Sequence, residues 1–221
     1  MIDRAVTAST IRRVIEAVKT LAAFDRQLWS YSLDLFRGGD SGAFVDGFAS
    51  SISNQLRRAW REGAGAVGVA PADMSEDDIA HLQATIDNEH NYVLDLAQAI
   101  EDAGKSGETL DQFRTQFRPR IELWSNRYTE VVNDAKVWFG DKQRLKWVYG
   151  DTEHCDTCAS LNGIVAYASE WKQSGLRPQN PPNDLLECGG WRCQCKLETT
   201  TDKRSPDALG TLMDIATGGN V

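Results

Sequence analysis

Five cysteines are the residues of this chain best suited to chemistry, and all of them lie between positions 155 and 195. Cys155 and Cys158 form a C-x2-C pair, a spacing at which two thiolates of one tight turn can bind a single ion about 2.3 Å away. An odd number of cysteines confined to one segment favours a local metal site over a disulfide framework. We therefore expect a structural zinc ion that is bound by four sulfurs.

The choice among the sulfurs follows from their spacing. Cys188 and Cys193 flank two glycines, so a second turn can fold back toward the C-x2-C pair. The predicted ligands are Cys155, Cys158, Cys188 and Cys193. Cys195 is the alternative fourth ligand, because residues two apart in a strand project to the same face. His154 could also replace a ligand, but adjacent residues of a tight turn rarely reach one ion together, so we expect an exposed or core histidine.

The sequence carries no recognisable catalytic constellation. The H-E-x-x-H, G-x-x-x-x-G-K-[ST] and G-x-S-x-G motifs are all missing, and the chain has three histidines. A zinc ion with four sulfur ligands has no vacant position at which water could be activated. We therefore expect a protein that is not an enzyme. A zinc-dependent hydrolase, which needs three protein ligands and a water, is the weakest alternative.

Four long helical stretches precede the cysteines, and we expect them at about residues 9–36, 41–61, 75–103 and 109–139. Their apolar residues recur at three- and four-residue steps, which is typical of helices with one buried face. The first stretch shows this in a stripe of Ile11, Val14, Ile15, Val18, Leu21, Ala22 and Leu28. The second has a predicted core seam at every fourth residue, made of Phe44, Phe48, Ile52, Leu56 and Trp60.

The ends of these helices have their own signals. Ser75 precedes an acidic run, and Thr109 stands three residues before Gln112, so both residues predict capping boxes at helix starts. Pro119 lies inside the fourth stretch. Proline removes a helical hydrogen bond, so it either kinks this helix or follows a loop.

The cysteine segment is expected to form a small α+β zinc-knuckle domain. Apolar residues on both sides of Asn162-Gly163 predict a short β-hairpin with an Asn-Gly turn. The prolines between residues 175 and 184 predict an irregular loop. Such a domain is too small for an aliphatic core, so we expect tryptophans to pack around the metal. These are Trp147, Trp171 and Trp191. The residues after 199 fit either a short docking helix or a mobile end.

Composition places a boundary near Gly140. Every cysteine and five of the six prolines follow position 118. The net charge is +1 over residues 142–206 and −9 over the remainder. We therefore predict a mainly α protein with a helical domain at 1–140, a cysteine-rich zinc-binding domain at 141–200 and a C-terminal tail at 201–221.

The overall charge and hydropathy exclude further classes. A net charge of −8 argues against a protein whose main partner is a phosphate backbone. No stretch approaches the roughly 20 apolar residues that a membrane-spanning helix needs. Charged residues interrupt the first thirty positions, so we expect neither a signal peptide nor a membrane partner.

The cysteine segment resembles the C-terminal region of tailed-phage minor head proteins, the head morphogenesis proteins of the phage Mu F-like group. The matching runs are E-H-C-D-T-C-A-S-L-N-G, an irregular proline-rich loop, and C-G-G-W-R-C-Q-C-K-L. The helical part is similar only in kind. Where the commoner form has a histidine in H-P-x-C-R-C, this chain has Cys188, two residues farther from the C-x-C. Cysteine can serve as the same ligand, and the longer spacing leaves Cys193 and Cys195 both open as the fourth.

The resemblance implies a low-copy structural protein of the phage head, made in the bacterial cytoplasm and placed near the portal vertex of the virion. It implies the portal protein, and possible other head or neck proteins, as partners in assembly, DNA packaging or delivery. Independently of the resemblance, we expect neither a small-molecule ligand nor direct DNA binding.

A zinc-ribbon protein that contacts nucleic acid is the main alternative. It is supported by local basic content, namely Arg144, Lys146, Arg177, Arg192, Lys196, Lys203 and Arg204.

Overall fold

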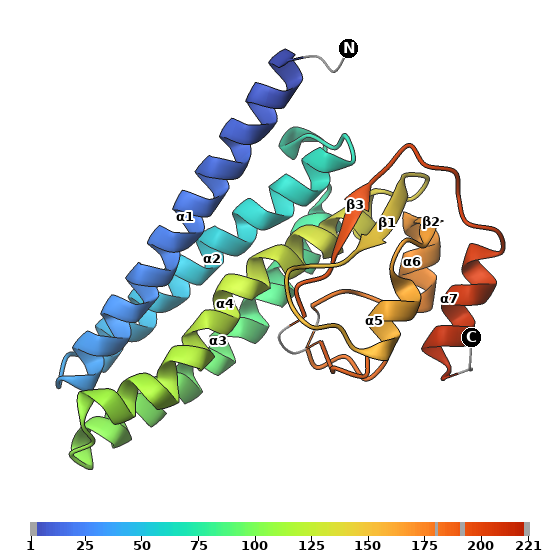
Figure 1. Ribbon diagram of the computed structural model, residues 1–221. Coiled ribbons are helices and arrows are strands. Elements are labelled where there is room, and N and C mark those ends of the chain that lie inside the picture. The colour runs from blue at the N-terminus through green and yellow to red at the C-terminus, as the bar shows by residue number, and fades with distance from the viewer. Residues whose placement is uncertain (1–3, 180, 191–192, 219–221) are drawn as a thin grey trace. The chain divides into compact units, whose positions relative to one another are not determined.

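The chain is mainly helical, and it ends in a small α+β part that contains the cysteines, as the sequence predicts (Figure 1). The computed structural model describes residues 4–179, 181–190 and 193–218, and side chains from residue 20 onward. The helices are α1 Arg4–Phe36, α2 Ser41–Ala66, α3 Glu76–Lys105, α4 Leu110–Phe139, α5 Asp156–Leu161, α6 Ala168–Ser174 and α7 Ala208–Ala216, with a 3-10 turn η1 at Pro71–Asp73. The strands are β1 Arg144–Val148, β2 Val165–Tyr167 and β3 Lys196–Thr199.

Helices α3 and α4 begin at the predicted positions because their capping boxes form, whereas α1 begins five residues earlier and α2 ends five residues later than predicted. Ser75 and Asp78 exchange hydrogen bonds between side chain and backbone at the start of α3. Thr109 and Gln112 do the same before α4. Helix α4 runs through Pro119, so the alternative of a loop before this residue is wrong. The part of the predicted α1 stripe from Ile11 to Val18 lies outside the described side chains.

The chain divides into two compact units, Met1–Ser53 with Ile86–Ser125, and Asn54–Thr85 with Asn126–Val221. Helices α2, α3 and α4 each contribute residues to both units. The predicted domain boundary at residue 140 is therefore not a boundary between these units, although α4 ends there, at Phe139. Whether residues 141–200 fold as an independent domain therefore stays a prediction.

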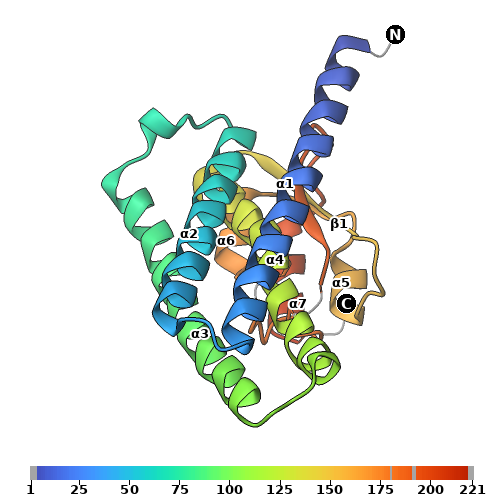
Figure 2. The ribbon, with the colours of Figure 1, turned by 90° about the vertical axis from the view of Figure 1, so that its left-hand side faces the viewer.

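The first unit contains segments of the four long helices α1 to α4 (Figures 1 and 2), and aromatic side chains join them. Phe36 of α1 stacks on Phe113 of α4 with ring centroids 4.3 Å apart. Phe48 of α2 meets the edge of Trp124 of α4, and the indole of Trp124 donates to buried Glu89 of α3 at 3.0 Å. All five residues of the predicted α2 seam are buried, three in this unit and Leu56 and Trp60 in the second, so that prediction is confirmed.

In the second unit, the ends of α2 and α4 approach closely. A Cβ on Gly63 would meet the carbonyl oxygen of Val132 and lie 2.6 Å from Cβ of Ala135. Only glycine therefore permits this approach. From α3, His81 stacks on Trp138 at 4.0 Å and pairs with Asp134 at 3.1 Å.

The sheet has the strand order β2-β1-β3, and both pairings are antiparallel. The predicted hairpin around Asn162-Gly163 is wrong. The residues before this turn form α5, Asn162 ends that helix, and Gly163 has a φ of +86°. Strand β2 pairs with β1 instead, with Lys146 opposite Val165. The apolar run was compatible with either pairing, since short runs do not reveal the strand's partner.

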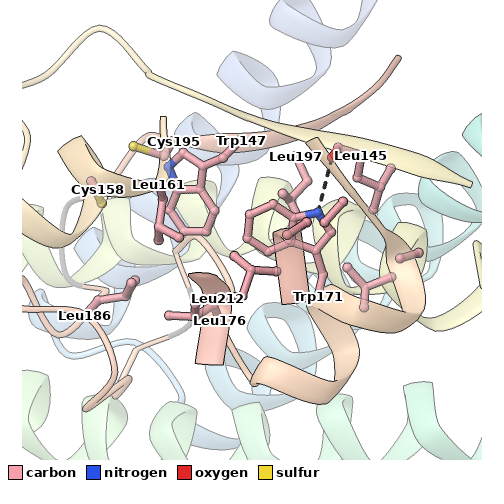
Figure 3. Packing of buried hydrophobic residues seen from close by; sticks show 14 of the residues in the cluster. Leu145, Trp147, Cys158, Leu161, Trp171, Leu176, Leu186, Cys195, Leu197 and Leu212 are labelled. Carbon is pink, nitrogen blue, oxygen red and sulfur yellow. Dashed lines mark hydrogen bonds between the residues drawn. The ribbon is translucent and has the colours of Figure 1, made fainter. Parts of the chain in front are cut away.

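The core of the cysteine region lies beneath this sheet (Figure 3). Trp147 and Trp171 are fully buried with ring centroids 5.7 Å apart, and Trp171 donates to the carbonyl of Leu145 at 3.2 Å. Both tryptophans share a core with Cys158, Cys193 and Cys195, whereas Trp191 lies outside the described residues. Helix α7 buries Ala208 and Leu212 in the same core, so a docking helix is observed after residue 199.

None of the helices in the described part of the chain is long and apolar enough to span a bilayer.

Candidate metal centre

The C-x2-C pair is placed by the start of a short helix. Cys155 stands at the N-cap of α5, where its Sγ accepts the backbone N–H of Cys158 at 3.4 Å. Cys158 lies in the first turn of α5 and is buried against the tryptophan core. Because α5 follows directly on the loop from β1, the thiols of this pair are held next to the sheet.

The other three cysteines come from the segment that leads into β3. Cys188 lies in a turn with Gly189 and Gly190, whose φ values of +61° and +79° favour glycine. Cys193 and Cys195 precede β3, so the C-x-C segment is not the strand that would set both side chains on one face. A Cβ on Gly150 would collide with the backbone of Gln194, which shows how closely the loop after β1 approaches this segment.

The five sulfurs form two groups of three within one cavity. In each group the sulfurs lie within 4.8 Å of one another. One group is Cys155, Cys158 and Cys188, and the other is Cys158, Cys193 and Cys195. Cys158 belongs to both, and its Sγ lies 4.0 Å from Sγ of Cys193. The structure therefore brings all the predicted ligands and the alternative ligand together, but which sulfurs bind stays a prediction.

The cavity holding these sulfurs has a volume of about 340 Å³ and is lined by the five cysteines and residues 152–154. Cys155 and Cys188 are half-buried, whereas the other three cysteines are buried. No disulfide links them. This sulfur cluster could hold a metal ion.

The buried cysteines shift one another's pKa values. Hydrogen bonds from Cys158 and Cys193 lower the pKa of Cys195 well below its ordinary value, and the backbone N–H of Gly150 and the indole of Trp147 add to this effect. The same hydrogen bonds, with burial, raise the pKa of Cys158 far above its ordinary value. A bound cation would take the place of the thiol protons.

Trp147 lies beside the cluster with its indole nitrogen turned toward a cysteine (Figure 3), an orientation that the residue pattern does not reveal. Its ring is fully buried, and Nε1 has no hydrogen-bond partner among the described residues. The indole nitrogen faces Sγ of Cys195 (Figure 3). An N–H directed at a ligating sulfur offsets thiolate charge and orients the ligand. The sequence feature that could have indicated this role is the position of Trp147 in a strand that leads to the cysteines.

His154 has a defined place beside the second group. Its imidazole stacks on Tyr149 with centroids 3.8 Å apart and planes 8° apart. Its Nδ1 lies 3.7 Å from Sγ of Cys195. His154 is therefore close enough to supply a nitrogen ligand after a small movement. The other two histidines have partners elsewhere, since His81 pairs with Asp134 and His90 contacts Ser53 at 3.2 Å.

Comparisons with known proteins gave no match, whether with family models, curated proteins or solved structures.

Proposed function

We propose that this chain is a structural minor capsid protein of a tailed-phage head, which docks near the portal vertex through its helical part and carries a zinc-stabilised C-terminal module. The observation that supports this proposal best is the convergence of five cysteines from two distant segments on one cavity. These segments are the ones whose residue pattern resembles the phage head morphogenesis proteins.

Zinc is the metal that suits this cluster. Soft thiolate ligands select zinc, copper(I) or iron–sulfur clusters over magnesium and calcium. Sulfur-rich zinc sites are structural in most proteins, and their binding energy contributes directly to folding. In this chain the buried sulfurs pack against Trp147 and Leu161, so the ion would hold α5 and the start of β3 to the same core. This arrangement supports a structural role for the metal.

The charge of the described surface favours a protein partner over nucleic acid. Four basic side chains near the cysteines form ion pairs. They are Lys146 with Asp202, Arg177 with Asp134, Lys196 with Glu198, and Arg204 with Glu170. Paired cations contribute less to a phosphate-binding surface than free ones. The strongly acidic remainder of the chain would be repelled by DNA and attracted to a basic protein surface.

The test is to co-express the full chain with the portal protein of the same phage and to separate the mixture by size. We expect the chain to elute with the portal ring, and electron microscopy of heads to place it at a single vertex. DNA retention should be absent at about 0.15 M salt. Failure to elute with the portal ring, together with salt-dependent DNA binding, would instead support the zinc-ribbon alternative.

A further inference from the structure

The two sulfur groups differ from the arrangement that one zinc ion requires. A tetrahedral ion about 2.3 Å from each sulfur sets every pair of its sulfurs roughly 3.8 Å apart. Apart from Cys158, the two groups have no sulfur in common. A single ion with four sulfur ligands would therefore have to draw together cysteines from both groups. One ion in each group would need only a small closing of three sulfurs that already lie within 4.8 Å of one another.

We propose that the centre holds two zinc ions bridged by Sγ of Cys158. One ion is bound by Cys155, Cys158 and Cys188, and the other by Cys158, Cys193 and Cys195. The distance of 4.0 Å from Cys158 to Cys193 already matches two sulfurs on a common ion. This inference rests on the zinc centre of the proposed function and extends it from one ion to two.

Charge favours the pair of ions. Five thiolates carry five negative charges, and two Zn²⁺ ions supply four positive ones, so the cluster is nearly neutral. A single ion with four thiolates keeps two net negative charges in a partly buried cavity, and it leaves the fifth cysteine without a role. Because three of the sulfurs are buried, the more neutral cluster is the less costly one to enclose.

The fourth ligands of the two ions differ. His154 Nδ1 lies 3.7 Å from Sγ of Cys195 but outside the group of three sulfurs, so His154 would have to turn toward Cys158 and Cys193 to complete the second group as a Cys3His site. The first group contains the two half-buried cysteines and faces the cavity, so water completes its ion. The second ion is thus the more enclosed, and the first should exchange with a chelator faster.

The test uses the full chain, loaded with zinc and freed of excess metal, and measures its mass under native conditions together with its zinc content. We expect two zinc ions per chain. Cys158→Ser should lose both ions, while Cys188→Ser and Cys195→Ser should each keep one. Thr157→Ser, a conservative change beside Cys158, should keep two. Loss of both ions from either single-group variant would contradict separate sites.

A measurement on the unaltered chain keeps the inference testable if a variant does not fold. After replacement of zinc by ¹¹³Cd, nuclear magnetic resonance should show two signals that are coupled through the bridging sulfur. One ion per chain and one signal would overturn the two-ion centre and leave the zinc centre standing. Two uncoupled signals would overturn the bridge. A chain that binds no zinc would instead overturn the metal centre of the proposed function.

Discussion

Asn133 of α4 accepts the backbone N–H of Leu197 in β3 through its Oδ1, at 3.1 Å. Lys136, one turn later, donates from Nζ to the carbonyl oxygen of the same residue at 2.6 Å. Leu197 lies opposite Trp147, and β3 is an edge strand whose outer N–H and C=O groups would otherwise lack partners. Helix α4 therefore closes the edge of the sheet that leads out of the cysteine segment.

Replacement of Asn133 should be costly. Asn133 is 1% exposed, so Asn133→Ala would leave the N–H of buried Leu197 without its acceptor. We expect a loss of about 1–3 kcal/mol in the free energy of unfolding, measured with urea at saturating zinc. The exposed change Gln116→Ala on the same helix should cost far less. Equal effects of the two changes would show that Asn133 does not hold the strand edge.

Lys136 should make stability depend on pH in the alkaline range. Burial lowers its pKa from the ordinary 10.5, and the charges of Glu198 and Glu62, which raise it, do not compensate. Lys196 nearby lowers it further. Between the folded-state pKa and 10.5, the unfolded chain binds a proton that the folded chain has released, so stability rises with pH.

The measurement compares the unaltered chain with Lys136→Met at about pH 7 and about pH 10, with zinc saturating in both. The free energy of unfolding of the unaltered chain should increase relative to that of the variant as the pH rises. A difference that stays constant, or that moves the other way, would show that Lys136 is not buried as a costly charge.

Replacement of two glycines of α2 by alanine should change the stability of the protein in opposite directions. In Gly63→Ala the added methyl meets Val132 and Ala135 of α4, so we expect a loss of about 1–3 kcal/mol in stability. Gly65 has no atom within 4 Å of its virtual Cβ, and Gly65→Ala should stabilise the helix by about 0.5–1 kcal/mol. Thermal unfolding of both variants tests this contrast. An unchanged melting temperature in Gly63→Ala would contradict the close approach of α2 and α4.

Trp147 should tune zinc affinity through its N–H. Trp147→Phe keeps an aromatic ring in the core and removes the donor that faces Cys195, so we expect zinc affinity to fall about tenfold. Trp171→Phe is the matched control, since its indole bonds to the carbonyl of Leu145 and not to sulfur. Competition with a chromophoric chelator measures both affinities. Equal losses in the two variants would refute a specific role for Trp147.

The four long helices were predictable because each carries its own signals. The spacing of the seam from Phe44 to Trp60 and the capping pairs of Ser75 and Thr109 are local in the sequence. Pro119 was ambiguous, because its exposed position lets α4 continue without disturbing the core. The low helix propensity of proline does not show whether the residue lies on the buried or the exposed side of a helix.

The cysteine segment was predictable as a cluster but not in its details. Strand β2 pairs with β1 across the sixteen intervening residues 149–164, and periodicity does not identify such a partner. The acceptor role of Asn133 depends on β3, which lies more than sixty positions later in the chain. The division of five sulfurs into two groups depends on how two turns face each other, and spacing does not determine this.

X-ray absorption at the zinc edge of the purified full chain reports the atoms that are bound to the metal. We expect a first shell dominated by sulfur at about 2.3 Å, which disappears in Cys158→Ser. A chain without zinc, or a first shell made only of nitrogen and oxygen, would contradict this expectation.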